Sequence, residues 1–218
     1  MRLKQKVDYI TSKLEKLYPN PEIPLDHENT FTFLVAVMLS AQSTDKKVNE
    51  ITPKLFSKAN TPEKMQTLDV LEIQNCIREI GLAPTKAKNI KRTSEILVER
   101  HDGKVPNTFD DLEELPGVGH KTASVIMSQA FGKPAFPVDT HIHRLAFRWK
   151  LSNGKNVDTT EKDLKRKFDK DLWNKLHLQM IFYGREFCQA RKKKCNCDIC
   201  EAVSSVSYTH LTLPTNTV

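Results

Sequence analysis

The sequence predicts an all-α protein. Apolar residues recur at helical spacing along most of the 218-residue chain, and no segment shows the sustained alternation that is typical of strands. Many of the seven glycines lie at the ends of predicted helices, where glycine is favoured. The predicted helices span residues 2–17, 28–41, 44–58, 62–66, 69–79, 85–99, 109–115, 120–131, 140–149, 158–167 and 171–186, and a cysteine loop follows.

The most apolar run, Phe31 to Leu39, contains Thr32 and is too short to span a membrane. We therefore expect a buried central helix there. Lys and Arg total 34 against 27 Asp and Glu, which gives a formal net charge of +7. This excess favours an anionic partner such as a nucleic acid, although a basic surface without such a partner would show the same composition.

The most informative motif is a glycine hairpin between the helices predicted at 109–115 and 120–131. It consists of Pro116, Gly117, Val118 and Gly119. The proline ends the first helix because it lacks an N–H and restricts the residue before it. The glycines allow backbone conformations and close approaches that a Cβ would block. Unpaired N–H groups at the start of the second helix suit a phosphate oxygen, and an ordinary tight turn is the alternative.

Two residues after the hairpin are candidates for catalysis. Lys121 lies in the first turn of a helix, where the helix dipole disfavours positive charge. A neutral amine there can act as a Schiff-base nucleophile, and a simple phosphate contact is the alternative. Asp139 lies eighteen residues later in the segment Val138-Asp139-Thr140-His141. Its carboxylate can stabilise positive charge and assist proton transfers, or it can serve only as a helix N-cap.

Four of the five cysteines fall within thirteen residues near the C-terminus. They are Cys188, Cys195, Cys197 and Cys200. We recognise no signal peptide, so these thiolates predict a metal centre in a reducing compartment rather than disulfides. An iron–sulfur cluster and a structural zinc ion are both compatible with them. Cys76 lies in an apolar periodic stretch and is expected in the core.

Five motifs, in order, resemble those of the endonuclease III family of DNA glycosylase/AP lyases in the helix-hairpin-helix superfamily. The resemblance covers about residues 5 to 202. The motifs are Ser40-Ala41-Gln42-Ser43-Thr44-Asp45, Ile80-Gly81-Leu82-Ala83 with Lys86-Ala87-Lys88-Asn89-Ile90, the hairpin from Leu115 to Ala123, Val138-Asp139-Thr140-His141, and Tyr183-Gly184-Arg185-Glu186-Phe187-Cys188.

This resemblance implies two helical domains that flank a DNA cleft. Residues 23–133 would form a six-helix barrel with the helix-hairpin-helix, and residues 1–22 with 134–204 would form a cluster domain. Residues 205–218 resemble nothing in the family, so we expect a non-native or disordered tail. The implied partner is double-stranded DNA with damaged or abasic sites, and we expect a cytoplasmic monomer.

The resemblance also implies a bifunctional enzyme of base excision repair. It would remove oxidised pyrimidines and nick abasic sites by β-elimination through a Schiff base on Lys121, with Asp139 stabilising positive charge. Gln42 and Leu82 match positions that fill the space left by a flipped base. Glu113 and Asp45 match pocket positions, with surface carboxylates as the alternative. The expected DNA contacts are Gln42, Leu82, Pro116, Gly117, Val118, Gly119, His141, Arg191, Lys192, Lys193 and Lys194.

The cysteine spacing departs from the family's Cys-x6-Cys-x2-Cys-x5-Cys. The first gap fits, but Asp198 and Ser204 stand where the third and fourth cysteines would fall. We therefore expect Cys188, Cys195, Cys197 and Cys200 to hold a [4Fe–4S] cluster, with zinc as the alternative. Two other functions remain open: a non-catalytic helix-hairpin-helix DNA-binding protein with a four-cysteine metal site, and an adenine mismatch glycosylase. The latter enzymes are longer and lack a lysine at the position of Lys121.

Overall fold

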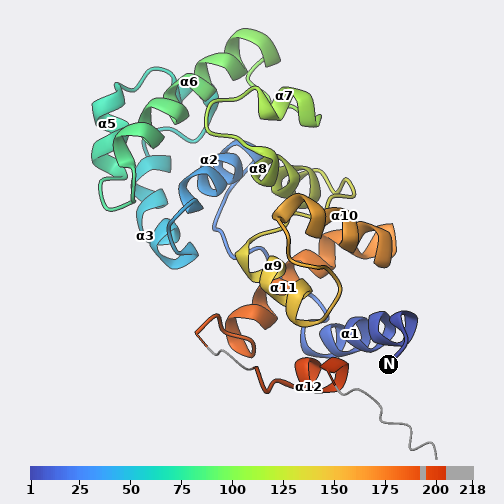
Figure 1. Ribbon diagram of the computed structural model, residues 1–218. Helices are drawn as coiled ribbons and strands as arrows, with labels where there is room; N and C mark the ends of the chain where they lie inside the picture. The colour runs from blue at the N-terminus through green and yellow to red at the C-terminus, as the bar shows by residue number, and fades with distance from the viewer. Residues whose placement is uncertain (192–194, 205–218) are drawn as a thin grey trace, which may run out of the picture.

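The computed structural model describes residues 1–191 and 195–204, and all regular structure in them is helical (Figure 1). The elements are α1 (Leu3–Leu17), α2 (Thr30–Ser40), α3 (Asp45–Phe56), α4 (Pro62–Met65), α5 (Val70–Cys76), α6 (Ala83–His101), α7 (Phe109–Glu113), α8 (His120–Val125), η1 (Ile126–Ala130), α9 (Thr140–Arg148), α10 (Val157–Lys167), η2 (Lys170–Leu172), α11 (Trp173–Glu186) and α12 (Asp198–Ser204). The predicted all-α fold class is confirmed. No helix among the described residues is both long and apolar enough to cross a membrane.

The structure differs from the predicted helices at two notable places. The expected cysteine loop contains α12, whose Ile199 and Val203 are buried. A helix of seven residues is unstable alone, so packing against the rest of the chain must stabilise it. The helix predicted at 120–131 changes into the π-helical turn η1, in which the Phe131 N–H donates to the Ile126 carbonyl. Apolar periodicity does not reveal such a local change of pitch.

Helix α2 is the centre of one hydrophobic cluster, which extends from Leu25 to Ala135. Every residue from Phe31 to Leu39 is buried, as the apolar run predicts. Asn29 and Thr32 start the helix by a reciprocal cap, in which each side-chain oxygen accepts the backbone N–H of the other. Because α3, α6, α8 and η1 contact α2, the hairpin helix is anchored directly to this cluster.

A second hydrophobic cluster joins the two ends of the chain. Ile10 and Leu14 of α1 are fully buried with residues of α9, α11 and α12, and Trp149 is fully buried among them. Figure 1 accordingly places α1 near α12, far from α5 and α6. We propose that the two clusters are the cores of two domains, residues 23–133 and residues 1–22 with 134–204.

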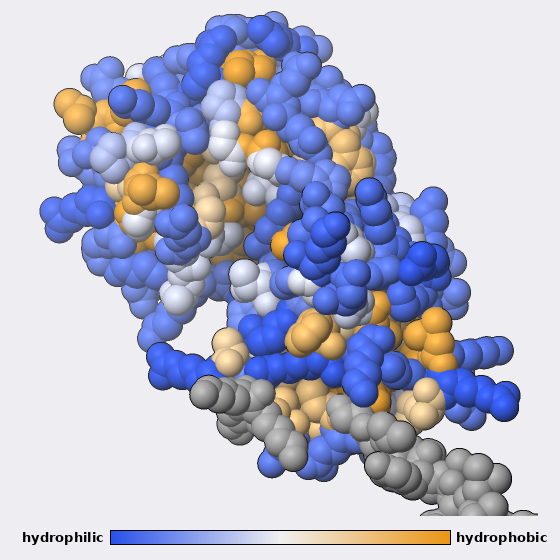
Figure 2. Space-filling model, viewed as in Figure 1, coloured by the Kyte–Doolittle hydropathy of each residue, from blue (hydrophilic) through white to orange (hydrophobic). Residues whose placement is uncertain are grey.

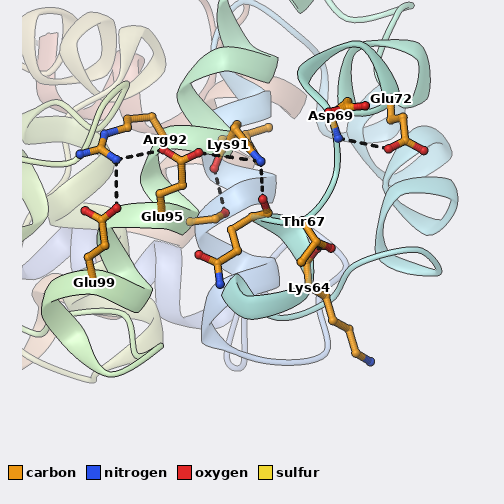
Figure 3. Close-up of polar contacts among 11 residues, drawn as sticks. Lys64, Thr67, Asp69, Glu72, Lys91, Arg92, Glu95 and Glu99 are labelled. Carbon is orange, nitrogen blue, oxygen red and sulfur yellow. Dashed lines mark hydrogen bonds and ion pairs between the residues drawn. The ribbon is translucent and has the colours of Figure 1, made fainter.

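Charged residues form ion pairs on the exposed side of α6 (Figure 3). Arg92 Nη1 lies 2.9 Å from Glu95 Oε2 and 3.4 Å from Glu99 Oε1. Lys91 Nζ donates to the Gln66 carbonyl and so ties α6 to the residue after α4. Hydrophilic residues cover most of the face seen in Figure 2. Exposed ion pairs contribute only about 0–1 kcal/mol each, so the buried clusters must supply most of the stability.

We predict that Leu34→Ala lowers the free energy of unfolding by about 2–5 kcal/mol, because it opens a cavity beside α2. Leu34 is fully buried, whereas Leu71 is 67% exposed, so Leu71→Ala is a matched control. The control should change the free energy by no more than about 0.5 kcal/mol. Urea unfolding followed by circular dichroism measures both values. Equal losses in the two variants would contradict the central position of α2.

Candidate functional site

The predicted hairpin lies between α7 and α8. Gly117 has a φ of +82°, in the left-handed region, and a Cβ there would lie 2.7 Å from Asn89 Nδ2. Gly119 is extended, and no described residue comes within 4 Å of the place of its Cβ. The positive φ and the contact with the Asn89 side chain therefore favour glycine at position 117, whereas the space beside Gly119 is open.

Two hydrogen bonds hold the hairpin against the first cluster. Thr93 Oγ1 of α6 donates to the Pro116 carbonyl at 3.1 Å. The Val118 N–H donates to the Leu115 carbonyl at 3.0 Å, and both of these side chains are buried. The start of α8 is consequently presented at a fixed place.

A cavity of about 80 Å³ lies beside α8 and brings the two catalytic candidates together. Lys121 lines it from the first turn of α8, and Asp139 lines it from the start of α9. Asp139 is also the N-cap of α9, because its Oδ1 accepts the Ile142 N–H at 2.8 Å. This bond fixes the carboxylate at the cavity wall, so the capping role and a role in the cavity are compatible. The side chain of Lys121 makes no hydrogen bond or ion pair with any described residue.

His177 of α11 lines the same cavity and was not predicted from the sequence. It is 3% exposed, and its Nδ1–H donates to the Pro137 carbonyl at 3.0 Å. Burial lowers the pKa of His177 to about 4, and it outweighs the charge of Asp139 and the hydrogen bond to the Pro137 carbonyl, which act in the opposite direction. The ring is therefore neutral near pH 7. No motif marks it in the sequence, where it is one polar residue in an apolar part of α11.

An ion pair joins two further residues of the cavity wall. Asp45 of α3 and Arg185 of α11 both line the cavity, and Arg185 Nη2 lies 2.7 Å from Asp45 Oδ2. The pair links a helix of the first cluster to a helix of the second. Both residues lie in the sequence motifs, but the family resemblance implies a pocket position only for Asp45.

Glu113, the other carboxylate expected in the pocket, does not line the cavity. It binds His120 Nδ1 at 2.7 Å, while His120 Nε2 lies 3.2 Å from Glu161 Oε2. Burial lowers the pKa of His120, but hydrogen bonds and charge from Glu113 and Glu161 outweigh it and raise that pKa above its ordinary value. The ring thus connects α7 to α10 beside the hairpin, and sequence reasoning missed it because Glu161 lies 41 residues away.

The other predicted DNA contacts occupy different places. Gln42 and Leu82 are exposed and lie in neighbouring turns, since a Cβ on Gly81 would be 3.9 Å from the Gln42 carbonyl oxygen. His141 does not line the cavity; its Nδ1 accepts from Arg144 Nη2 at 3.1 Å. Arg191 is exposed. The remaining three predicted contacts lie outside the described residues: Lys192, Lys193 and Lys194.

The four clustered cysteines come together in the structure. Their Sγ atoms all lie within 4.8 Å of one another, and Cys188 and Cys200 are buried. None of them forms a disulfide. Thiolates bound to one tetrahedral zinc ion at ~2.3 Å lie ~3.8 Å apart, and a four-iron cluster spaces its ligands more widely because each binds a different iron. The spacing in this structure is therefore nearer to the zinc value, whereas the chemical type of the ligands, four thiolates, suits either group. Cys76 is separate and buried in the first cluster, as predicted.

Comparison with known proteins identifies the family. Residues 35–170 match the model of the HhH-GPD superfamily of base excision DNA repair proteins. The chain is 42% identical to endonuclease III of Bacillus subtilis (strain 168) over 196 residues, which cover 89% of each protein. It is 43% identical to endonuclease III of Escherichia coli (strain K12) over 196 residues, which cover 88% of this chain and 93% of the relative.

Solved structures agree with the sequence relatives. A non-covalent endonuclease III–DNA complex superposes with a TM-score of 0.87 at 39% identity and covers 92% of this chain and 95% of its own. A trapped endonuclease III–DNA covalent intermediate superposes with a TM-score of 0.85 at 38% identity, with coverages of 93% and 99%. The chain therefore belongs to the endonuclease III family of the HhH-GPD superfamily.

Proposed function

We propose that this chain, a bifunctional DNA glycosylase/AP lyase of base excision repair, removes oxidised pyrimidines and nicks abasic sites with Lys121 as its nucleophile. The observation that carries the assignment is the shared cavity of Lys121 and Asp139. The Lys121 amine makes no hydrogen bond or ion pair with any described residue, and the neutral ring of His177 adds no second cation to the cavity. These features support a nucleophilic amine rather than a simple phosphate contact.

The reaction follows from those groups. The neutral Lys121 amine attacks C1′ of a flipped nucleotide, and the bond from C1′ to the base breaks with its electron pair on the leaving base. Asp139 stabilises the positive charge that develops on the sugar and assists proton transfers. Opening of the sugar leaves an imine on Lys121. The imine makes the C2′ proton acidic, so its removal expels the 3′ phosphate, and water then releases the amine.

Binding to DNA would use groups around the cavity. The loop amides from Pro116 to Gly119 and the start of α8 suit a phosphate oxygen, since the space beside Gly119 is open. Gln42 and Leu82 are proposed to fill the space of the flipped nucleotide. Arg191 and the net charge of +7 favour binding to the phosphates of the DNA backbone. We also propose a cytoplasmic location, in line with the bacterial relatives.

We propose that the four cysteines hold a [4Fe–4S] cluster with a structural role. The donor set is right for it, and the ligands come from one short segment that α12 packs against the second hydrophobic cluster. In the sequence Arg191 lies between Cys188 and Cys195, so a cluster bound to both cysteines would restrain the position of Arg191. The cysteines do not line the cavity of Lys121, so the proposed chemistry does not involve them.

Lys121→Gln should abolish covalent adducts that borohydride traps on abasic DNA, because an amide cannot form the imine. Binding to the same DNA should remain, since the hairpin is unchanged. The measurement is a denaturing gel of trapped complexes beside a binding titration. Lys64→Gln, at an exposed lysine on α4, is the control and should trap like the wild type. Undiminished trapping in Lys121→Gln would refute this assignment.

Asp139→Asn should keep the fold and DNA binding but lower turnover by about two to three orders of magnitude, because it removes the negative charge. Asparagine is as good an N-cap as aspartate, so α9 should persist and the melting temperature should stay close to that of the wild type. Single-turnover cleavage of lesion DNA gives the rate. Wild-type turnover in this variant would reduce Asp139 to a helix cap.

Protein purified without oxygen should contain about four irons per chain and little zinc, as expected for the cluster type. Elemental analysis and the visible absorption of an iron–sulfur protein provide the measurement. Stoichiometric zinc without iron would replace the cluster with a tetrahedral four-cysteine zinc site. Cys76→Ser is the matched control and should leave the metal content unchanged, because Cys76 lies in the other hydrophobic cluster.

A further inference from the structure

Gln42 and Leu82 share an unusual backbone conformation. Their φ angles are +58° and +62°, and only two other non-glycine residues among those described have positive φ. Such conformations cost about 1–3 kcal/mol each and persist only where the surroundings enforce them. Gln42 follows the end of α2 and Leu82 immediately precedes α6. Both side chains are exposed, so their own packing does not supply the enforcement.

The side chain of Lys86, in the first turn of α6, binds the carbonyls at the end of α2. Its Nζ donates to the Leu39 carbonyl at 2.8 Å and to the Ala41 carbonyl at 2.5 Å. The Ala41 carbonyl belongs to the peptide group that leads directly into Gln42. The backbone N–H of Lys86 donates to the Leu82 carbonyl at 3.0 Å, which is the ordinary hydrogen bond of the first turn of α6. The Lys86 side chain therefore ties this first turn, which directly follows Leu82, to the peptide group that precedes Gln42.

The surroundings of this lysine indicate a specific role. Lys86 is 7% exposed, and among the described residues its ammonium binds two carbonyls and has no carboxylate within ion-pair distance. Burial lowers its pKa, as expected for an ammonium withdrawn from water. The Leu39 carbonyl in the last turn of α2 lies beyond the regular backbone hydrogen bonds of the helix, and the helix dipole favours a cation there. The lysine is thus a C-terminal cap supplied by a different helix.

We propose that Lys86 is a positioning residue that sets the spacing and direction of Gln42 and Leu82 when they enter the space of the flipped nucleotide. The inference rests on the gap-filling role proposed above for these two residues. The gap in a duplex has fixed dimensions, and a misplacement of about 1 Å far from the chemistry can cost about a hundredfold in rate. Lys86 itself touches neither the cavity nor its catalytic groups.

The test compares duplex and single-stranded substrates. Lys86→Met should lower kcat/KM on lesion-containing duplex DNA by about ten- to a hundredfold. The lyase rate on an abasic single strand should stay within about twofold of the wild-type rate, because a single strand has no gap to fill. Lys88→Met changes an exposed lysine of the same helix and should leave both rates unchanged. Lys86→Arg keeps a cation that can donate twice, so it should recover part of the duplex activity.

Reading the ratio of the two rates keeps the test valid if Lys86→Met is less stable, because unfolding lowers both rates equally. An equal loss on both substrates, or no loss on the duplex, would overturn the inference. In a Gln42→Ala/Leu82→Ala background, Lys86→Met should cause no further loss on the duplex, since it acts through those residues. A further multiplicative loss would also overturn it.

The failure of the proposed function has a different signature. If Gln42→Ala/Leu82→Ala leaves duplex activity unchanged, the gap-filling role fails and the role of Lys86 fails with it. Borohydride trapping by the wild type and its loss in Lys121→Gln would still report on the catalytic assignment. If the double variant is impaired and Lys86→Met is not, only the role of Lys86 is wrong.

Discussion

The connection between η1 and α9 is the constraint on which the site depends, because it joins the two hydrophobic clusters next to the cavity. Asn174 of α11 clamps it: its Nδ2 donates to the Ser128 carbonyl at 3.2 Å, and its Oδ1 accepts the Ala135 N–H at 3.2 Å. Ala135 belongs to the first cluster and Phe136 to the second. The distance from the helix of Lys121 to the cap of α9 is set by this short, doubly anchored segment.

Positive and negative side chains around the cavity offset one another, and they come from both hydrophobic clusters. Lys121 contributes a potential cation and Asp139 an anion, while burial keeps His177 neutral near pH 7. Asp45 and Arg185 neutralise one another across the two clusters. Among the residues that the structure describes, Lys121 is thus the one unpaired amine that lines the cavity, and the other charges there leave no net excess of buried charge, which would be costly. Strain at Gln42 and Leu82 is likewise confined to turns outside the two cores.

Local sequence patterns predicted most of the helices and the candidate functional residues. Apolar periodicity predicted most helices and the buried α2. A helix with one buried face has apolar residues at helical spacing, and a fully buried helix has a continuous apolar run. The hairpin and the aspartate segment are contiguous, so their residue types alone marked Lys121 and Asp139. Four cysteines within thirteen residues marked a metal-binding segment for the same reason. Their roles in catalysis and cluster binding are predictions that await the experiments above.

Other features were decided only by the tertiary structure. His177, Arg185 and Glu161 reach the site or its border from helices far along the chain, and their environment arises only when α10 and α11 pack. Helix α12 and the π turn η1 depend on packing and on local pitch, which periodicity does not encode. By itself the sequence determined the fold class, the family and the residues capable of the chemistry, because those lie in short contiguous motifs. Only the tertiary structure decided which of them share a cavity and which distant side chains set their charge and position.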